Sequence, residues 1–180
     1  MATGIKVFAP ASVANLACGY DILGLALERP GDEIIIRKTD GKGLKINKIF
    51  GADRKLPTDI HKNTAGLAAY ALLKSVDRIG EGIEMDIYKK MPSGSGLGSS
   101  AASAAAAVWG INALLDLRLT KRELLHFAVL GEQAADGSYH ADNVAPSLMG
   151  GIIFIRDNES LDIHKLPPIP GLYLAMVHPA

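Results

Sequence analysis

The most constraining feature of the sequence is a glycine- and serine-rich segment, Pro92–Ser100 (PSGSGLGSS), between a predicted strand and a predicted helix. Before it, Ile83–Tyr88 alternates apolar and polar residues, which is typical of a half-buried strand. After it, Ala101–Leu115 is rich in alanine, the strongest helix former. Glycine permits positive φ, and a helix N-terminus attracts anions. The segment therefore predicts a loop that holds a phosphate group, with the hydroxyls of Ser99 and Ser100 at the start of the helix.

Two familiar phosphate-binding motifs do not fit this loop. A Walker A loop requires Gly-Lys followed by Ser or Thr, whereas Gly98 is followed directly by Ser99. A dinucleotide-binding fingerprint requires G-x-G-x-x-G, whereas Gly94 and Gly96 are followed by Gly98. Asp116 has the spacing of that fingerprint's acid, but it follows a helix instead of a second strand. The remaining alternative is a mobile loop without a ligand, and the regular elements predicted on both sides argue against it.

The composition excludes several classes of protein. Hydrophobic residues make up 48% and charged residues 21% of the chain, which is typical of a globular protein. The chain has 19 Lys and Arg against 19 Asp and Glu, so it lacks the positive excess that favours nucleic-acid binding. Cys18 is the single cysteine, and no apolar run approaches the roughly 20 residues of a membrane span. We expect a soluble, cytoplasmic protein without nucleic-acid or membrane partners.

The first part of the chain is predicted to be rich in strands. Ile5–Phe8 is β-prone and leads into a loop of small residues, Pro10–Gly19. An apolar segment, Ile22–Leu27, follows the loop. The β-branched content of Glu33–Lys38 and Leu44–Phe50 predicts two further strands.

The rest of the chain is predicted to alternate helices with short strands. Apolar residues spaced three and four apart predict a helix over Asn63–Val76. Thr120 and Glu123 have the spacing of a capping box and predict a helix that runs to about Ala135. His140–Gly151 is interpreted as a turn-rich connector. The last predicted strands are Ile152–Ile155 and Leu172–Val177. Strands followed by helices predict an α+β fold.

The phosphate loop also resembles a known signature. Pro92–Ala102 (PSGSGLGSSAA) matches without a gap the pattern Pro-x-x-x-Gly-Leu-Gly-Ser-Ser-Ala-Ala of the galactokinase, homoserine, mevalonate and phosphomevalonate (GHMP) kinase superfamily. The resemblance implies an α+β N-terminal domain of these kinases (ribosomal protein S5 domain 2-like) with a left-handed βαβ unit. It further implies that ATP binds with the helix from Ser99 directed at the triphosphate, and that catalysis proceeds by electrostatic positioning of the γ-phosphoryl group.

The same resemblance assigns residues to ATP and Mg²⁺. Asn63 corresponds to an Asn on the adenine side, with an N-cap of the following helix as the alternative. Lys89 resembles a lysine on the phosphate side, and Lys90 is its alternative. Ser100 and Glu132 correspond to the protein ligands of Mg²⁺, which prefers oxygen. The implied ATP-binding residues are Asn63, Lys89, Pro92, Ser93, Gly94, Ser95, Gly96, Leu97, Gly98, Ser99 and Ser100.

Two further segments resemble homoserine kinases, one branch of the superfamily, and imply L-homoserine as the phosphoryl acceptor. PASVANLACGYDILGLAL places Asn15 and Asp21 at positions that face the substrate in those enzymes, and HADNVAPSLMGG does the same for His140 and Asn143. A zwitterionic amino alcohol needs an anion for its ammonium group and amides that orient its hydroxyl. Asn143 and Asp21 are therefore the expected catalytic residues. Their structural alternatives are a turn cap for Asp21 and an Asx turn before Pro146 for Asn143.

The sequence also departs from the homoserine kinase pattern. Ala17 and Cys18 stand where many of these enzymes have Gly-Pro, and the general base stays open between Asp21 and Asp142. The final LYLAMVHPA resembles the strand before a Thr-x-x-Ala-Arg segment, so we expect a truncation that lacks the arginine for the substrate carboxylate. Residues 1–165 are expected to form the ATP-binding domain, and 166–180 to begin a C-terminal ferredoxin-like domain that is largely missing.

Three functions follow from these patterns. The first is ATP-dependent conversion of L-homoserine to O-phospho-L-homoserine, a step of threonine biosynthesis, by an enzyme that also forms a homodimer and of which this chain alone is inactive. The second is phosphorylation of another small alcohol by a sister kinase of the superfamily. The third is a nucleotide-binding module without catalytic activity.

Overall fold

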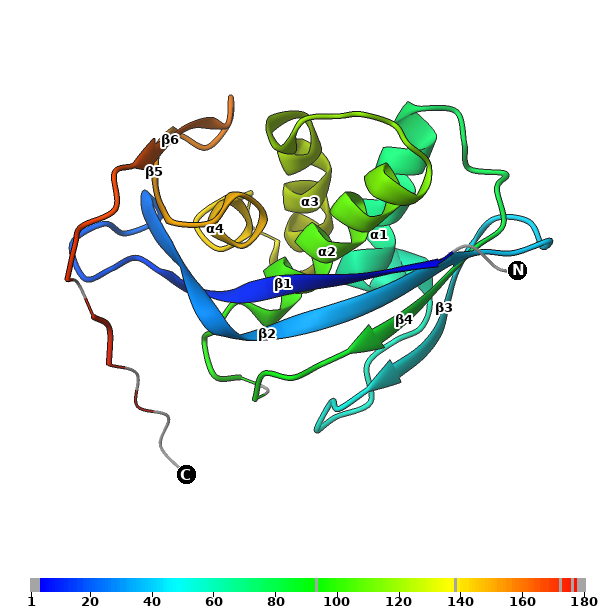
Figure 1. Ribbon diagram of the computed structural model, residues 1–180, viewed down its shortest axis with the longest axis horizontal. Coiled ribbons are helices and arrows are strands. Elements are labelled where there is room, and N and C mark those ends of the chain that lie inside the picture. The colour runs from blue at the N-terminus through cyan, green and yellow to red at the C-terminus, as the bar shows by residue number, and fades with distance from the viewer. Residues whose placement is uncertain (1–3, 93, 138, 172, 176, 178–180) are drawn as a thin grey trace.

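The computed structural model describes residues 4–92, 94–137, 139–171, 173–175 and 177. The predicted α+β class is confirmed, because a mixed six-stranded sheet carries the helices on one face (Figure 1). In chain order the elements are β1 (Gly4–Ala14), β2 (Leu23–Lys38), β3 (Leu44–Phe50), the 3₁₀ turn η1 (Ile60–Lys62), α1 (Thr64–Ser75), β4 (Ile83–Tyr88), α2 (Ser99–Leu114), α3 (Lys121–Asp136), α4 (Val144–Met149), β5 (Ile152–Asp157) and β6 (Asp162–Leu166).

Strand β2 connects the whole sheet. The strand order is β3-β4-β2-β5-β6, and β1 also pairs with β2. The sequence predicted two separate segments here, Ile22–Leu27 and Glu33–Lys38, but the structure joins them into one strand that changes partners along its length. Leu23–Leu25 pairs with β5, whereas Glu33–Lys38 pairs with β4, both antiparallel. Strand β3 pairs with β4 in the parallel direction.

Strand β1 is longer than predicted. It continues through Ala14, so the expectation that a loop begins at Pro10 is wrong for the first half of that loop. The register against β2 shifts between Pro10 and Ser12, which marks a bulge. Successive residues of a regular strand point to opposite faces, yet Ala11 and Ser12 are both fully buried. The bulge therefore turns Ser12 toward the helices.

Helix α2 forms the centre of the core and confirms the helix predicted after the phosphate loop. It packs against β1 and β2 on one side and against α1 and α3 on the other (Figure 1). Such a helix is apolar all round, and its alanines from Ala101 to Ala107 are buried. Gly110 brings the backbone close to the sheet, since a Cβ there would lie 2.4 Å from Cδ1 of Ile36. Small side chains thus let the helix lie close to every neighbour.

Three details of the chain's second half differ from the prediction. The segment predicted as a connector contains α4. Pro146 does not prevent this helix, because it lies in the first turn, where a missing N–H is tolerated. Strand β6 was not predicted; its sequence, DIHKL, is too polar to suggest a strand. The predicted strand Leu172–Val177 is wrong for residues 173–175 and 177, which have no regular structure, while residues 172 and 176 lie outside the described part of the chain.

The sheet face opposite the helices carries ion pairs beside partly exposed apolar residues such as Phe8 and Ile35. Lys6 pairs with Glu33 at 2.7 Å, and Lys45 pairs with Glu84 at 3.7 Å. Side chains alternate between the two faces along β2 and β4. Glu33 and Glu84 therefore point away from the face that holds buried residues such as Ile34. Of the helices in the described ranges, none is long and apolar enough to cross a membrane.

The crossing of α1 and α3 depends on Gly131. A Cβ at this position would lie 2.6 Å from the carbonyl oxygen of Thr64 and 2.8 Å from Cβ of Ala68. We expect Gly131→Ala to lower the free energy of unfolding by about 1–3 kcal/mol, because overpacking outweighs the ~1 kcal/mol gain in helix propensity. Urea unfolding measures the change. Gly80→Ala is the matched control, since a Cβ there meets nothing within 4 Å. A Gly131→Ala protein more stable than the parent would contradict this packing.

Candidate functional site

A pocket of about 720 Å³ lies where the loop after β4 meets the start of α2. Its walls come from the segment before α1, from the loop itself, from the first turn of α2, and from α3 and the residue before α4. The residues assigned from the sequence that line it are Asn63, Lys89, Pro92, Gly94, Ser95, Gly96, Leu97, Gly98, Ser99, Ser100, Glu132 and Asn143. Ser93, which was also assigned, lies outside the described residues. The fold therefore gathers residues that are up to eighty positions apart in the sequence.

The phosphate loop has the backbone geometry that its glycines suggested. Gly94, Gly96 and Gly98 have φ values of 72°, 72° and 64°, a region that residues with a Cβ rarely adopt. Gly98 is the N-cap of α2, and no side chain of the described residues caps this helix end. The first N–H groups of α2 are thus available to an anion in the pocket.

Gly98 is also crowded. A Cβ at Gly98 would lie 2.2 Å from Oγ of Ser12 and 2.8 Å from Oδ1 of Asn143. Those two atoms are hydrogen-bonded, with Ser12 donating to Asn143 at 2.8 Å. The backbone N–H of Ser12 also donates to the carbonyl of Leu97 at 3.0 Å. Ser12 therefore joins the phosphate loop to Asn143 and fixes the oxygen side of that amide.

Lys89 lies beside the start of α2 in a network of polar groups. Its ammonium group donates to the carboxylate of Asp32, to the carbonyl of Ser99 at 2.8 Å and to Oγ of Ser103 at 2.8 Å. Burial lowers the pKa of Lys89, and the charge of Asp32 opposes that shift. The alternative residue, Lys90, pairs with Glu33 at 2.8 Å and does not line the pocket. Of the two lysines, Lys89 is the one placed beside the phosphate loop.

Ser100 and Glu132 meet on the pocket wall. Oγ of Ser100 donates to Oε1 of Glu132 at 2.5 Å, which joins the first turn of α2 to α3. A hydroxyl and a carboxylate are oxygen ligands of the kind that Mg²⁺ binds. Among the residues that the structure describes, no group of three or more His, Cys, Asp or Glu could hold a metal ion.

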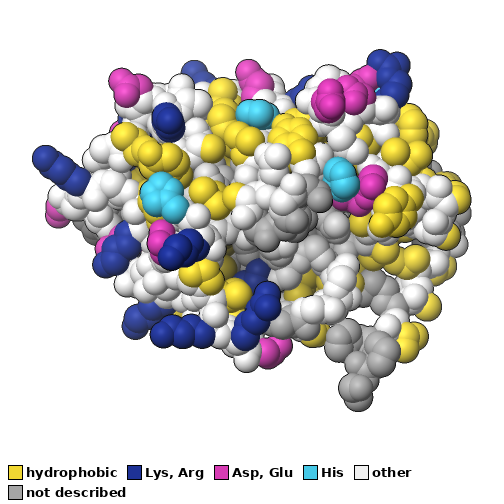
Figure 2. All heavy atoms as spheres, turned by 180° about the vertical axis from the view of Figure 1, so that it is seen from behind, with side chains coloured by type: hydrophobic (Ala, Val, Ile, Leu, Met, Phe, Trp, Pro, Cys, Tyr) yellow, Lys and Arg dark blue, Asp and Glu magenta, His cyan; other side chains and the backbone are white. Residues whose placement is uncertain are grey.

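The pocket has more positive than negative charge. Arg54, Lys62 and Lys89 line it, against the single lining carboxylate of Glu132 among the described residues. Figure 2 shows the face of the molecule seen from behind, where Lys and Arg side chains gather toward the lower left, on the side where β3 lies. A positively charged concave surface favours a polyanion.

Asn63 has a structural role in addition to its place on the pocket wall. Its Oδ1 accepts hydrogen bonds from the N–H groups of Ala65 at 3.0 Å and Gly66 at 3.3 Å, so it is the N-cap of α1. Its Nδ2 donates to the carbonyl of Pro57 at 3.0 Å. The N-cap alternative is confirmed, and contact with adenine stays a prediction.

Three of the four residues assigned to the acceptor form a separate cluster. Oδ1 of Asn15 accepts from the N–H of Asp21 at 2.9 Å, and Nδ1 of His140 lies 3.5 Å from Oδ1 of Asp21. Asn158 holds the cluster to the framework, donating to the carbonyl of Asp21 at 3.1 Å and accepting from the N–H of Ala141 at 3.0 Å. Asn15, Asp21 and His140 do not line the pocket, whereas the fourth residue, Asn143, does.

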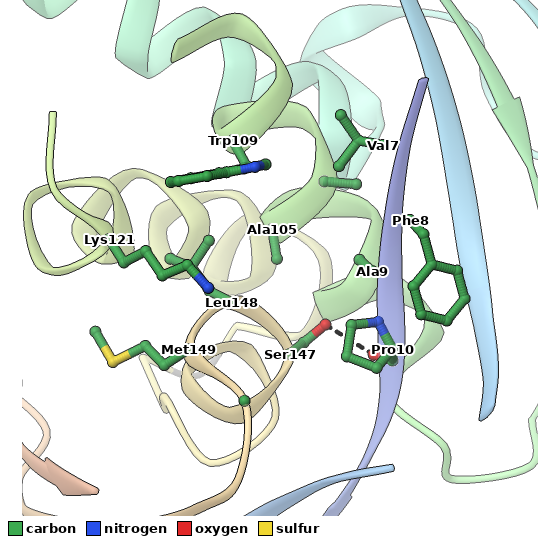
Figure 3. A pocket seen from close by; sticks show the side chains of 12 residues that line it. Val7, Phe8, Ala9, Pro10, Ala105, Trp109, Lys121, Ser147, Leu148 and Met149 are labelled. Carbon is green, nitrogen blue, oxygen red and sulfur yellow. Dashed lines mark hydrogen bonds between the residues drawn. The ribbon is translucent and has the colours of Figure 1, made fainter. Parts of the chain in front are cut away.

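A second, smaller pocket of about 190 Å³ lies between β1, α2 and α4 (Figure 3). Trp109 and Lys121 lie on one side of it, with the ammonium group 5.3 Å from the ring centroid. Ser147 donates to the carbonyl of Pro10 at 2.8 Å and closes the opposite side. None of the described residues that the sequence assigned to ATP or acceptor lines this pocket. The larger pocket is therefore the candidate site.

Sequence reasoning missed Ser12, Asp32 and Ser103, which surround the start of α2. Asp32 is in phase with the buried residues Ile34 and Ile36 of the same strand, but the three consecutive isoleucines from Ile34 to Ile36 do not show in the sequence which face is buried. A carboxylate at a core-facing strand position indicates a buried ion pair. Ser12 gave no signal in the sequence either, because its inward direction depends on the bulge in β1.

The comparisons with known proteins agree with this geometry. Residues 63–151 match the model of the GHMP kinases N terminal domain. The chain is 44% identical to a homoserine kinase of Chlorobium phaeovibrioides and to one of Chloroherpeton thalassium, covering 97% and 96% of this chain and 58% and 57% of those proteins. A crystal structure of homoserine kinase from Cytophaga hutchinsonii superposes with a TM-score of 0.87 at 51% identity, covering 91% of this chain and 52% of that one. The chain thus spans a little over half the length of these relatives.

Asp142 provides a test of the electrostatics around Asp21 and His140. Its side chain is buried, which raises its pKa above the ordinary value, and the nearby charge of Asp21 raises it further, while His140 acts in the opposite direction. Stability that depends on the neutral carboxyl is present at low pH and is lost as pH rises through the raised pKa. We expect Asp142→Asn to raise the thermal midpoint more at about pH 7 than at about pH 3.5. A gain that is equal at both pH values would contradict the raised pKa.

Proposed function

The chain belongs to the GHMP kinase superfamily, and from this we propose that it is the nucleotide-binding portion of an ATP-dependent homoserine kinase. The reaction would convert L-homoserine to O-phospho-L-homoserine. The observation that carries the proposal is the meeting of the glycine loop, the uncapped start of α2 and Asn143 in one pocket. The homoserine kinases that are similar over nearly the whole chain support the choice of acceptor. A cytoplasmic location, a homodimer and the division at residue 165 remain predictions.

The phosphates of ATP would lie against the loop from Gly94 to Gly98. The N–H groups at the start of α2 point toward this anion, and the helix dipole adds to the attraction. Arg54 and Lys62, which also line the pocket, supply further positive charge. The glycines of the loop already have positive φ, so binding phosphate requires little change of backbone conformation. This supports a preorganised site.

Ser100 and Glu132 would be the protein ligands of Mg²⁺. Their oxygens already lie in contact across the α2–α3 junction, so the residues present fit a hard cation. When bound, Mg²⁺ neutralises phosphate charge during phosphoryl transfer. The protein's own contribution is to hold the two oxygens on packed helices.

The acceptor would lie between Asp21 and the pocket. The carboxylate of Asp21 can pair with the ammonium group of an amino alcohol; His140 lies beside that carboxylate, and Asn15 holds the backbone of Asp21 by accepting its N–H. Asn143 would orient the hydroxyl, because Ser12 occupies its Oδ1 and leaves the Nδ2 donors for the reacting oxygens. Asp21 and Asp142 both stay candidates for the group that receives the hydroxyl proton.

The magnesium assignment predicts a conditional loss of nucleotide affinity. Glu132→Gln retains an acceptor for Ser100 at nearly constant volume but removes the negative charge. We expect at least about tenfold weaker binding of a non-hydrolysable ATP analogue in Mg²⁺, because a charged metal ligand is lost. Calorimetric titration in Mg²⁺, and again in the presence of a chelator, distinguishes a loss of metal-dependent binding from a general loss of affinity. Equal affinities of parent and variant in Mg²⁺ would remove Glu132 from the site.

The acceptor assignment predicts a preference among alcohols. A form extended to the length of its relatives should phosphorylate L-homoserine faster than mevalonate or galactose, because Asp21 and Asn143 suit a small amino alcohol. An assay coupled to ADP release measures the rate for each alcohol. Faster turnover of mevalonate or galactose would favour a sister kinase, and nucleotide binding without turnover of any alcohol would favour a non-catalytic module.

A further inference from the structure

We infer that Asp32 is a positioning residue of the nucleotide site, holding Lys89 and the first turn of α2 in the arrangement that receives phosphate. The inference rests on the proposed function. Asp32 does not line the pocket, so it acts through other residues and is not itself a ligand.

Asp32 is fully buried and accepts hydrogen bonds from four groups. These are the ammonium group of Lys89, the N–H of Lys90 at 2.8 Å, Oγ of Ser99 at 2.7 Å and Oγ of Ser103 at 3.4 Å. The donors belong to the two residues that follow β4 and to the first two turns of α2, while Asp32 itself lies on β2. One carboxylate thus fixes the two elements that the phosphate loop connects.

Burying the carboxylate of Asp32 is unfavourable in free energy, and its ionic and hydrogen-bonding partners offset this. Burying a charge is unfavourable unless it is paired and hydrogen-bonded. Asp32 has 0% exposure, and its partner Lys89 has 11% side-chain exposure. Asparagine, with one carbonyl oxygen, could accept from some of these donors but could not balance the charge of Lys89. The negative charge itself is therefore required as long as Lys89 is charged.

Ser99 is the residue through which Asp32 positions Ser100 and the end of the phosphate loop. Its hydroxyl donates to Asp32 and its carbonyl accepts from Lys89, so the first residue of α2 is held at two points. The next residue, Ser100, presents its hydroxyl to Glu132, and the preceding residue, Gly98, turns the loop. A shift of Ser99 would move both neighbours, and displacements of about 1 Å at such sites reduce function strongly.

Lys89 is constrained in the same way. An ammonium group has three donors, and those of Lys89 are directed at Asp32, Ser99 and Ser103. Without Asp32, buried Lys89 would lose its hydrogen-bonded carboxylate and keep the smaller contribution of the Glu132 charge, which also raises the pKa of Lys89. Asp32 and Lys89 therefore act as a unit, and their effects on nucleotide binding should not be additive.

The test measures binding of a non-hydrolysable ATP analogue in Mg²⁺ by calorimetry, on the chain as it is. We expect Asp32→Asn to weaken binding by about tenfold or more, since charge-assisted contacts are lost. The double variant Asp32→Asn with Lys89→Met should bind no more weakly than Lys89→Met alone. Glu33→Gln is the matched control, because the neighbouring carboxylate pairs with Lys6 and Lys90 on the opposite sheet face, and it should bind as the parent does.

The outcomes separate the inference from the proposed function. If the parent chain does not bind the analogue, the proposed nucleotide site fails. If the parent binds and Asp32→Asn binds within about twofold of it, or the two losses are additive, the positioning role is overturned. Should Asp32→Asn fail to fold, Ser103→Ala decides, because it removes one acceptor of Lys89 within an alanine-rich helix. Ser103→Ala is expected to weaken binding severalfold, and unchanged affinity would overturn the inference.

Discussion

The close packing of α2 between the sheet and the other helices is the constraint on which this structure depends. Alanines fill the helix surface, and Gly110 lets its backbone approach Ile36 more closely than any side chain would allow. Because the helix cannot shift in such a core, its first turn has a fixed place. The phosphate loop, which joins β4 to that turn, ends at this fixed place. Apolar packing therefore places the body of the helix, and polar contacts at its start complete the site.

Polar contacts hold the end of the phosphate loop and the start of α2 from two sides. Asp32 and Lys89 hold the start of α2 from the β2 side, and Ser12 with Asn143 crowd Gly98 from the other. Each contact joins an element of the sheet to the helical layer. Such buried groups cost free energy unless they are all satisfied, so a substitution that removes one of them leaves its partners unsatisfied.

The sequence predicted most regular elements because their signals were local. The alternation in β4, the alanines of α2 and the capping box of Thr120 each lie within a single segment, and the structure contains all three. The single long β2, the bulge before Ser12 and helix α4 depend on contacts with distant strands, which no local pattern encodes. The pocket residues on the loop were predictable from its resemblance to the GHMP signature, whereas Asp32 required knowing which way β2 faces.

The two halves of the candidate site are built on different supports, and this separation has a consequence for how the fold can diversify. The proposed nucleotide residues lie on the glycine loop and on the packed helices beside it, whereas Asn15 and Asp21 lie in a loop of left-handed residues held by hydrogen bonds with the side chains of Asn15 and Asn158. A loop held in this way can exchange residues without disturbing the core. In the proposed kinase, specificity for a different alcohol would therefore arise on the loop side, while the residues around α2 stay unchanged.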